Sequence, residues 1–204
     1  MTVETEPGRE FCARVSESGF EPGSLAGWLD GLSHAERVAA VRAAGRSEQR
    51  RLYEAVEGFA SLGLVDMVPS TTREGTAVRH HGKNTLPAFT HFEKRFCRPS
   101  GCDSTDPDRL YGFNFQTLAA ITGPGYFVAV PNDQRSEVLV DYRRLPGEQP
   151  AGWPNIRSNE KGLSRFVYGF MVDTLRRVSE HVTIGSAARK GKDMGSWFLL
   201  TREP

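Results

Sequence analysis

The sequence predicts an α+β fold in which an N-terminal helical hairpin packs on a C-terminal antiparallel β-barrel or half-barrel. From residue 23 to residue 62, apolar residues recur at the spacing of three and four positions that is typical of amphipathic helices. From residue 110 onward, apolar and polar residues alternate with a period of two, as in half-buried strands. A chain of 204 residues can bury a sizeable core, and we expect one main domain.

Residues 1–22 are predicted to be a flexible segment and residues 23–62 a helical hairpin. The first segment is acidic, contains Pro and Gly, and lacks a sustained period. In the second, Ser33 and Glu36 have the spacing of a capping box, and Gly45 is expected to end the helix that they start. A second helix is expected from Ser47, with apolar residues along one side.

Residues 63–109 are predicted to be a basic, loop-rich region. Prolines and glycines break this stretch into short pieces, with one extended or helical element between Phe89 and Phe96. From Arg73 to Arg98, six basic residues outnumber two acidic ones, whereas the whole chain has a formal net charge of +1. Any attraction for an anion must therefore come from a local patch such as this one.

Residues 110–204 are predicted to form the antiparallel sheet with one helix. Turn signals of Gly, Pro and Asn separate the alternating runs. An apolar stripe from Leu163 to Val178 has helical spacing, so we expect a helix that covers one opening of the sheet. The strands are expected at residues 111–117, 126–130, 137–144, 182–189 and 197–201.

The first of these strands has an aromatic face and a polar face. Asn114 lies on the polar face between Gly112 and Gln116, where the glycine leaves room for a ligand; exposure of this face to water is the alternative. The aromatic face, continued by the next strand, is expected to form the apolar wall of a cavity. Its residues are Tyr111, Phe113, Phe115, Tyr126 and Phe127.

The C-terminal part of the chain resembles the closing segment of the lipocalin-like GXWXG family. The matching order is Asp173-Thr174-Leu175-Arg176-Arg177-Val178, Thr183-Ile184-Gly185, Lys190-Gly191 and Phe198-Leu199-Leu200-Thr201-Arg202. The Gly-x-Trp-x-Gly opening strand of that family is absent from this sequence. The resemblance implies a small antiparallel barrel or half-barrel, which either holds one apolar ligand or is filled by its own side chains.

Cysteine content and hydropathy bear on the compartment and on cofactors. An odd number of cysteines, three, and an N-terminus without a secretory signal predict a reducing cytoplasm. No run approaches the roughly 18 consecutive apolar residues of a membrane span. We expect no metal and no cofactor, because neither Cys-x-x-Cys nor His-x3-5-His spacing is present. The residues that a metal would otherwise use are His80 or His81, His91, Cys97 and Cys102.

The segment from Arg79 to Lys83 is the richest in groups that could carry chemistry. An unperturbed imidazole titrates at about pH 6.5, so His80 or His81 is a candidate general acid or base. Asp141 or Tyr142 is its candidate partner. Neighbouring histidines on a strand point to opposite sides, and a solvated or structurally satisfied histidine is the alternative. The sequence patterns of serine hydrolases and of phosphate-binding loops are absent.

These patterns predict a protein that binds a small, partly apolar, anionic molecule in a barrel-like cavity. One alternative is an enzyme that uses a histidine in the same cavity. Another is a nucleic-acid or protein adaptor that acts through the basic loops, although nucleic acid is not the expected partner; oligomerisation stays open. Asp141 and Arg143 share one face of a strand and could bind a carboxylate or phosphate; an exposed ion pair is the alternative. The expected ligand contacts are Lys83, His91, Arg95, Tyr111, Phe113, Asn114, Phe115, Tyr126 and Arg143.

Overall fold

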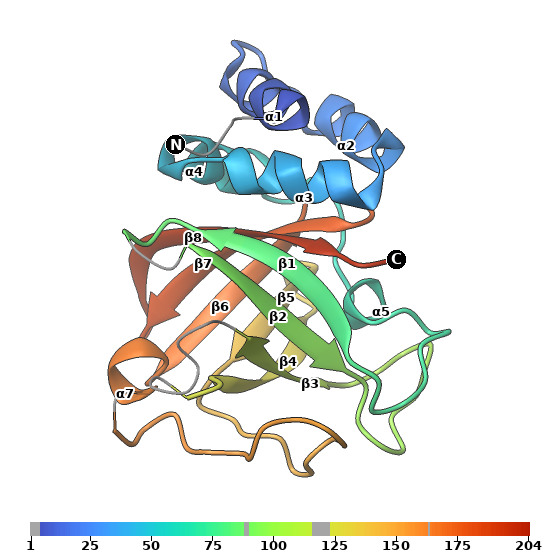
Figure 1. Cartoon of the computed structure of the whole chain (residues 1–204), viewed down its shortest axis with the longest axis vertical. Coiled ribbons are helices and arrows are strands. Elements are labelled where there is room, and N and C mark those ends of the chain that lie inside the picture. The colour runs from blue at the N-terminus through green and yellow to red at the C-terminus, as the bar shows by residue number, and fades with distance from the viewer. Residues whose placement is uncertain (1–4, 88–89, 116–122, 163) are drawn as a thin grey trace.

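A closed antiparallel barrel forms the centre of the computed structural model, which describes residues 5–87, 90–115, 123–162 and 164–204 (Figure 1). Within those ranges each strand pairs with the next along the chain, and β1 pairs with β8 to close the barrel. The α+β barrel with N-terminal helices is therefore confirmed. The strands are β1 (Val78–Asn84), β2 (His91–Cys97), β3 (Leu110–Phe115), β4 (Tyr126–Asn132), β5 (Glu137–Asp141), β6 (Met171–Arg177), β7 (Val182–Arg189) and β8 (Lys192–Arg202).

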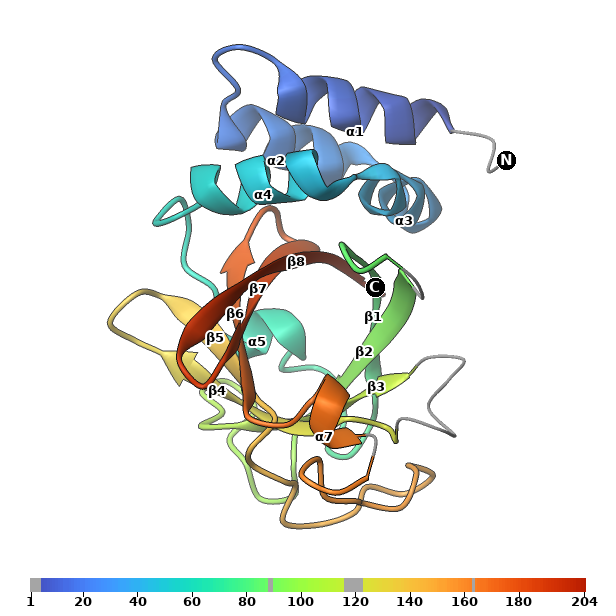
Figure 2. The same ribbon diagram turned by 90° about the vertical axis from the view of Figure 1, so that its left-hand side faces the viewer.

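A layer of helices covers one side of the barrel (Figure 2). Helices α3 and α4 contact strands β7, β8 and β1, and α1 packs on α3 and α4. The predicted capping box begins α3, since Ser33 and Glu36 each hydrogen-bond to the other's backbone N–H. A second core joins the layer to the outer face of β7 and β8, where Ile184 and Leu199 are fully buried. The helices are α1 (Glu6–Ser16), α2 (Pro22–Gly31), α3 (His34–Ala43) and α4 (Arg46–Ala55).

Helix α1 lies where a flexible segment was expected, so that prediction is wrong for residues 6–16. Thr5 caps the helix by accepting a hydrogen bond from the backbone N–H of Gly8. Pro7, which suggested a break, lies in the first helical turn, where its missing N–H costs nothing. The helix is held by packing, because Phe11 and Val15 are fully buried against the other helices.

Strands β1 and β2 fall in the region that was predicted to be mostly loop. The extended or helical element expected near residues 89–96 is β2, although Phe89 lies outside the described residues. Strand β1 escaped prediction because its inward side carries His80 and Gly82 in place of large apolar residues. Between α4 and β1, the short helix α5 (Leu64–Met67) packs into the barrel core.

The helix predicted from Leu163 to Val178 is wrong. Leu163 lies outside the described residues; the chain then forms the four-residue helix α7 (Ser164–Val167) and strand β6. Strand β6 pairs with β5 on one side and β7 on the other, so tertiary pairing overrides a spacing that also fits a helix. Strand β7 has the predicted bounds, whereas β8 begins earlier than expected.

The two ends of the barrel differ in how they are filled. Figures 1 and 2 show α5 at one end and α7 at the other. At the α5 end, Leu64 and Met67 join an interior core that includes Phe96, Phe127 and Leu200. The α7 end contains a cavity. No helix of the described residues is both long and apolar enough to cross a membrane.

Candidate functional site

A cavity of about 130 Å³ lies inside the barrel at the end next to α7. Its deep part contains the polar side chains of Lys94, Asn114, Tyr142 and Asp173. Toward the surface it is bordered by Leu86 and Met194, which are 48% and 42% exposed and therefore mark the opening. The apolar walls are Phe92, Val167, Tyr168, Met171, Ala187 and Phe198.

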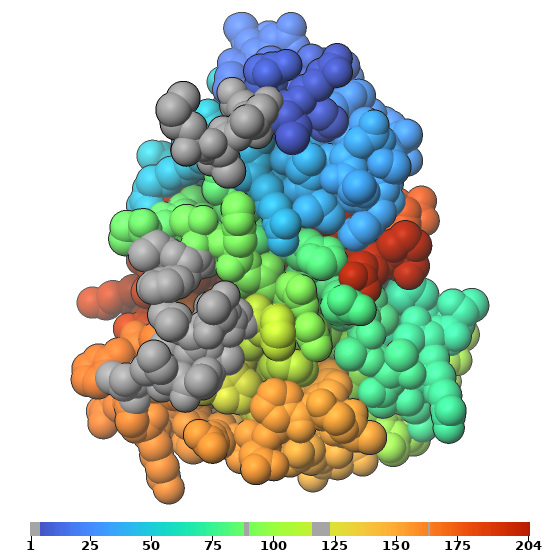
Figure 3. Space-filling model, viewed as in Figure 1, coloured from blue at the N-terminus to red at the C-terminus, as the bar shows by residue number. Residues whose placement is uncertain are grey.

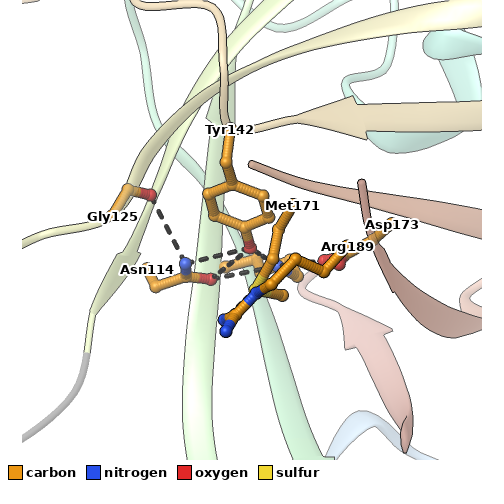
Figure 4. Close-up of polar contacts among 7 residues, drawn as sticks. Asn114, Gly125, Tyr142, Met171, Asp173 and Arg189 are labelled. Carbon is orange, nitrogen blue, oxygen red and sulfur yellow. Dashed lines mark hydrogen bonds and ion pairs between the residues drawn. The ribbon is translucent and has the colours of Figure 1, made fainter. Parts of the chain in front are cut away.

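A hydrogen-bond network crosses the floor of this cavity (Figure 4). Lys94 Nζ donates to Asn114 Oδ1 at 3.1 Å, to Asp173 Oδ2 at 3.2 Å and to the Tyr142 hydroxyl. Asn114 Nδ2 donates to the Tyr142 hydroxyl at 3.0 Å and to the carbonyl of Gly125 at 3.4 Å. The network thus ties together residues from β2, β3 and β6 and from the end of β5.

Burial shifts the pKa of every titratable group in the network toward its neutral form. Burial lowers the pKa of Lys94, although the charge of Asp173 opposes this shift. Burial also raises the pKa of Asp173, with Lys94 opposing, and raises the pKa of Tyr142 well above its usual value. A buried lysine with a depressed pKa is a common feature of functional sites, although structural ion pairs produce it too.

One acceptor in this network is left over. The three protons of a lysine ammonium are matched by the three acceptors around Lys94. By contrast, Asp173 Oδ1 is buried and has no hydrogen-bond partner of normal geometry among the described residues, although a hydrogen bond from Tyr142 lowers the pKa of this carboxyl group. A buried acceptor without a partner costs about 1–3 kcal/mol. Asp173 lines the cavity, so its carboxyl group is the candidate acceptor for an incoming molecule, whereas Lys94 has no unused donor.

Aromatic rings surround the amine of Lys94. Its Nζ lies 4.8 Å from the ring centroid of Phe198 and 4.9 Å from that of Tyr142. Phe127 and Phe92 follow at 5.2 Å and 5.7 Å. Rings at this range attract a cation through their quadrupoles, so they offset part of the cost of burying an ammonium group.

Interior glycines create the space that these rings occupy. A Cβ on Gly112 would lie 2.2 Å from the ring of Phe127, and one on Gly185 would lie 2.3 Å from the ring of Phe198. Gly112 was expected to leave room for a ligand beside Asn114. Phe127 fills that space, and the cavity lies further toward α7. Glycine is needed here for close side-chain packing against the backbone.

The aromatic face of β3 points out of the barrel. Tyr111, Phe113 and Tyr126 are buried on the outer side beneath Trp153, whose ring centroid is 4.7 Å from that of Phe113. Phe115 is 48% exposed and stacks with Arg95. Of the expected apolar wall, only Phe127 belongs to the interior core, and it does not line the cavity.

The candidate catalytic residues are not brought together. His80 faces the barrel interior at the α5 end, where its Nε2 lies 2.9 Å from the carbonyl of Met67, and burial lowers its pKa to about 3. His81 faces the helical layer, so the two histidines do point to opposite sides. Tyr142 is in the cavity. Asp141 lies outside, where Arg143 hydrogen bonds overcome the effect of burial and lower the pKa of its carboxyl.

The four expected basic ligand contacts lie on the outer surface. Lys83 Nζ donates to the carbonyl of Ala43 at 3.2 Å and so holds the end of α3 against β1. Arg95 forms a two-point contact with Glu93, and Arg143 forms one with Asp141. His91 is exposed at the start of β2. Of the predicted ligand contacts, only Asn114 lines the cavity.

Two central residues of the site, Lys94 and Asp173, were not predicted. A signal for Lys94 was present, because Phe92, Lys94 and Phe96 alternate on the buried side of β2. A charged residue at an apolar position of such a strand is costly unless it has a partner, and it therefore marks a functional or structural site. Asp173 was missed because the sequence pattern predicts a helix for residues 163–178.

In searches of protein-family models, curated proteins and solved structures, nothing matched this chain.

Proposed function

We propose that the barrel binds a small, mostly apolar molecule that carries an uncharged hydrogen-bond donor, such as a hydroxyl group. The observation that best supports this function is the combination of an apolar cavity with the unpartnered acceptor Asp173 Oδ1. The apolar part would lie against the cavity walls, and the donor would satisfy the carboxylate.

Charge balance favours a neutral head group over the anionic one that the sequence suggested. Lys94 is neutralised by Asp173, and its three protons already have acceptors. A carboxylate would have to displace one of these acceptors and would add a second negative charge beside Asp173. An anionic ligand is therefore an alternative that the same binding assay can reveal.

The size of the cavity limits the ligand. Its volume of about 130 Å³ compares with an engineered protein cavity of about 150 Å³ that binds benzene. A single-ring compound with one hydroxyl group is thus a suitable probe, and longer ligands would extend past Leu86 and Met194 into solvent.

A matched set of single-ring compounds tests the proposal. We expect phenol and benzyl alcohol to raise the melting temperature more than toluene, benzoate or benzylamine, because only the alcohols supply a neutral donor. A ligand at 100 times its Kd stabilises the protein by about 2.7 kcal/mol, which thermal denaturation detects. Equal effects of toluene and phenol would remove the role of Asp173, and a preference for benzoate would support the anionic ligand.

Two variants locate the binding site. Ala187→Leu enlarges a side chain of the cavity wall, at the β7 position that pairs with Asp173, and it should abolish stabilisation by phenol. Phe115→Ala removes an exposed ring outside the barrel and should leave it unchanged. Stabilisation by phenol that survives in Ala187→Leu would show that the compound binds elsewhere, and the proposal would fail.

A second candidate function is carbonyl chemistry at Lys94. The observation that favours it is a buried amine with a lowered pKa at the wall of the cavity. The neutral amine would attack an aldehyde carbon and, with loss of one water, form an imine. Incubation with benzaldehyde and borohydride should then add one benzyl group per chain, and Lys94→Met should prevent it. No mass increase, or an increase that persists in Lys94→Met, would count against this chemistry.

A further inference from the structure

A second polar cluster lies outside the barrel, where the helical layer meets β1 and the C-terminal residues. It consists of His34, His81 and Glu203, whose ligand atoms all lie within 4.8 Å of one another. His34 is the first residue of α3, His81 is on β1, and Glu203 follows β8. In Figure 3 the red C-terminal residues emerge directly below the blue helices, at this junction.

We propose that His34, His81 and Glu203 bind one Zn²⁺ ion. Two imidazole nitrogens and one carboxylate oxygen are a ligand set that zinc accepts, with water in the fourth position. This cluster differs from the set that sequence spacing had led us to reject, since only His81 belongs to both. Local spacing could not reveal it, because its members are separated by most of the chain.

One edge of the coordination sphere is already formed. His81 Nε2 lies 3.0 Å from Glu203 Oε1. Tetrahedral zinc with bonds of about 2.0–2.1 Å needs ligand atoms about 3.3 Å apart. The His34 ring centroid is 5.4 Å from that of His81, so a small approach of His34 would complete the site.

The His34 ring has a nitrogen available for a metal. Its Nδ1 is buried and has no hydrogen-bond partner among the described residues. The ring also hydrogen-bonds to the backbone of Arg202. Metal-binding histidines commonly use one ring nitrogen for the metal and the other for a backbone carbonyl or a carboxylate.

His81 has a comparable arrangement on its far side. Its Nδ1 lies 3.9 Å from Glu93 Oε1, so a slight closure would place a carboxylate behind the metal-binding ring. Glu203 is fixed by its backbone N–H, which donates to the carbonyl of Arg79 at 2.9 Å. Its second carboxyl oxygen, Oε2, lies 3.3 Å from Arg79 Nε, which leaves Oε1 for the ion.

A bound ion would link the helical layer, β1 and the C-terminal residues. Without a metal, the His81–Glu203 contact is an ordinary hydrogen bond and the unpartnered nitrogen of His34 has no role. A metal site accounts for both residues and for the arrangement of Glu93 behind them.

Metal titration of the full chain tests the proposal. After treatment with a chelator, the protein should bind one equivalent of Zn²⁺ in calorimetry, and Co²⁺ should give the intense visible absorption of a tetrahedral site. His34→Ala and His81→Ala should each lower the affinity more than about 100-fold, beyond the 10- to 100-fold effect of outer-shell changes. Glu93→Gln should lower it by about 10-fold.

Two further variants make the outcome decisive. His91→Ala removes an exposed histidine of β2 outside the cluster and should bind zinc as the wild type does. Glu203→Gln keeps the side-chain shape while removing the charge, so it should fold normally and bind zinc weakly. The proposal fails if the wild type shows no saturable binding, if His34→Ala retains wild-type affinity, or if His91→Ala loses as much affinity as His34→Ala.

Discussion

The amine of Lys94 lies 3.2 Å from a carboxyl oxygen of Asp173, and the pair joins opposite walls of the barrel. Strands β2 and β6 are four positions apart in the closed order of eight strands. The two side chains are only 3% and 2% exposed. The pair therefore separates the packed core at the α5 end from the cavity at the α7 end.

Removing one charge of this pair should destabilise the protein strongly. Asp173→Asn leaves the ammonium of Lys94 buried without its counter-charge, and breaking a buried pair typically costs about 3–5 kcal/mol. Lys94→Met/Asp173→Asn should lose less than the sum of the single variants, because neither charge remains. Urea denaturation at pH 7 measures these differences.

The exposed pair Arg50–Glu54 provides the control. Its side chains are 64% and 61% exposed, so Glu54→Gln should change the free energy of unfolding by less than about 1 kcal/mol. If Asp173→Asn were as mild as Glu54→Gln, the buried pair would contribute little to the fold.

The same variant should become more stable as the pH rises. Asp173 opposes the lowering of the pKa of Lys94 by burial, so Asp173→Asn should lower that pKa further. Between the folded pKa and the unfolded value of about 10.4, the unfolded chain binds the proton and the folded chain does not. The added stability of Asp173→Asn is therefore fully present above the unfolded pKa of Lys94, and it is lost as the pH falls through the folded pKa of Lys94.

Urea denaturation of Asp173→Asn at several pH values up to about 10 checks this slope, which cannot exceed about 1.4 kcal/mol per pH unit for one group. Lys94→Met/Asp173→Asn lacks the titrating amine and supplies the background slope. Identical slopes for the two variants would mean that Lys94 keeps an unperturbed pKa.

Sequence periodicity predicted the barrel but not which faces point inward. In β3, five of six residues are buried, so both faces are covered and alternation cannot separate inside from outside. The deciding element is the segment 144–162, which places Trp153 over Phe113 and Tyr126. That segment has no regular period, so the sequence does not predict where it packs on the barrel.

The candidate site was predicted in part. Asn114 and Tyr142 were singled out, and both line the cavity. Lys94 and Asp173 were missed because a charged residue in an apolar run is usually assigned to the solvent side. Their compensation comes from a partner on the opposite wall, which only the closed topology provides.

Gly112 should not tolerate alanine. A Cβ there would lie 2.2 Å from the Phe127 ring and 2.7 Å from the backbone carbonyl oxygen of Arg95, which cannot move freely. We expect Gly112→Ala to cost about 1–3 kcal/mol, as overpacking does. Chemical denaturation measures the loss.

Gly27→Ala is the matched control for this prediction. Gly27 lies in α2, and a Cβ there would have no neighbour within 4 Å. Alanine should stabilise that helix by up to about 1 kcal/mol. Equal effects of the two substitutions would mean that the Phe127 ring moves aside, and that the interior is less tightly packed than the 2.2 Å approach indicates.

Cys97 should be unreactive until the segment 144–162 detaches from the barrel. The thiol is fully buried beneath this segment, and burial raises its pKa to about 12. Asn159 holds the segment, since its Nδ2 donates to the carbonyls of Tyr126 at 2.6 Å and Tyr142 at 2.8 Å. Asn159→Ala removes both bonds and should speed labelling of Cys97 by a thiol reagent at pH 8.

Peptide mass spectrometry follows each cysteine separately in this experiment. Gln149→Ala is the control, because Gln149 hydrogen-bonds to Trp153 within the segment itself, and its loss should leave Cys97 protected. Cys12, which is partly exposed, reports on the helical layer and should label at the wild-type rate in both variants. Faster labelling of Cys97 and Cys12 together would indicate global unfolding, because detachment of residues 144–162 alone exposes only the thiol beneath them.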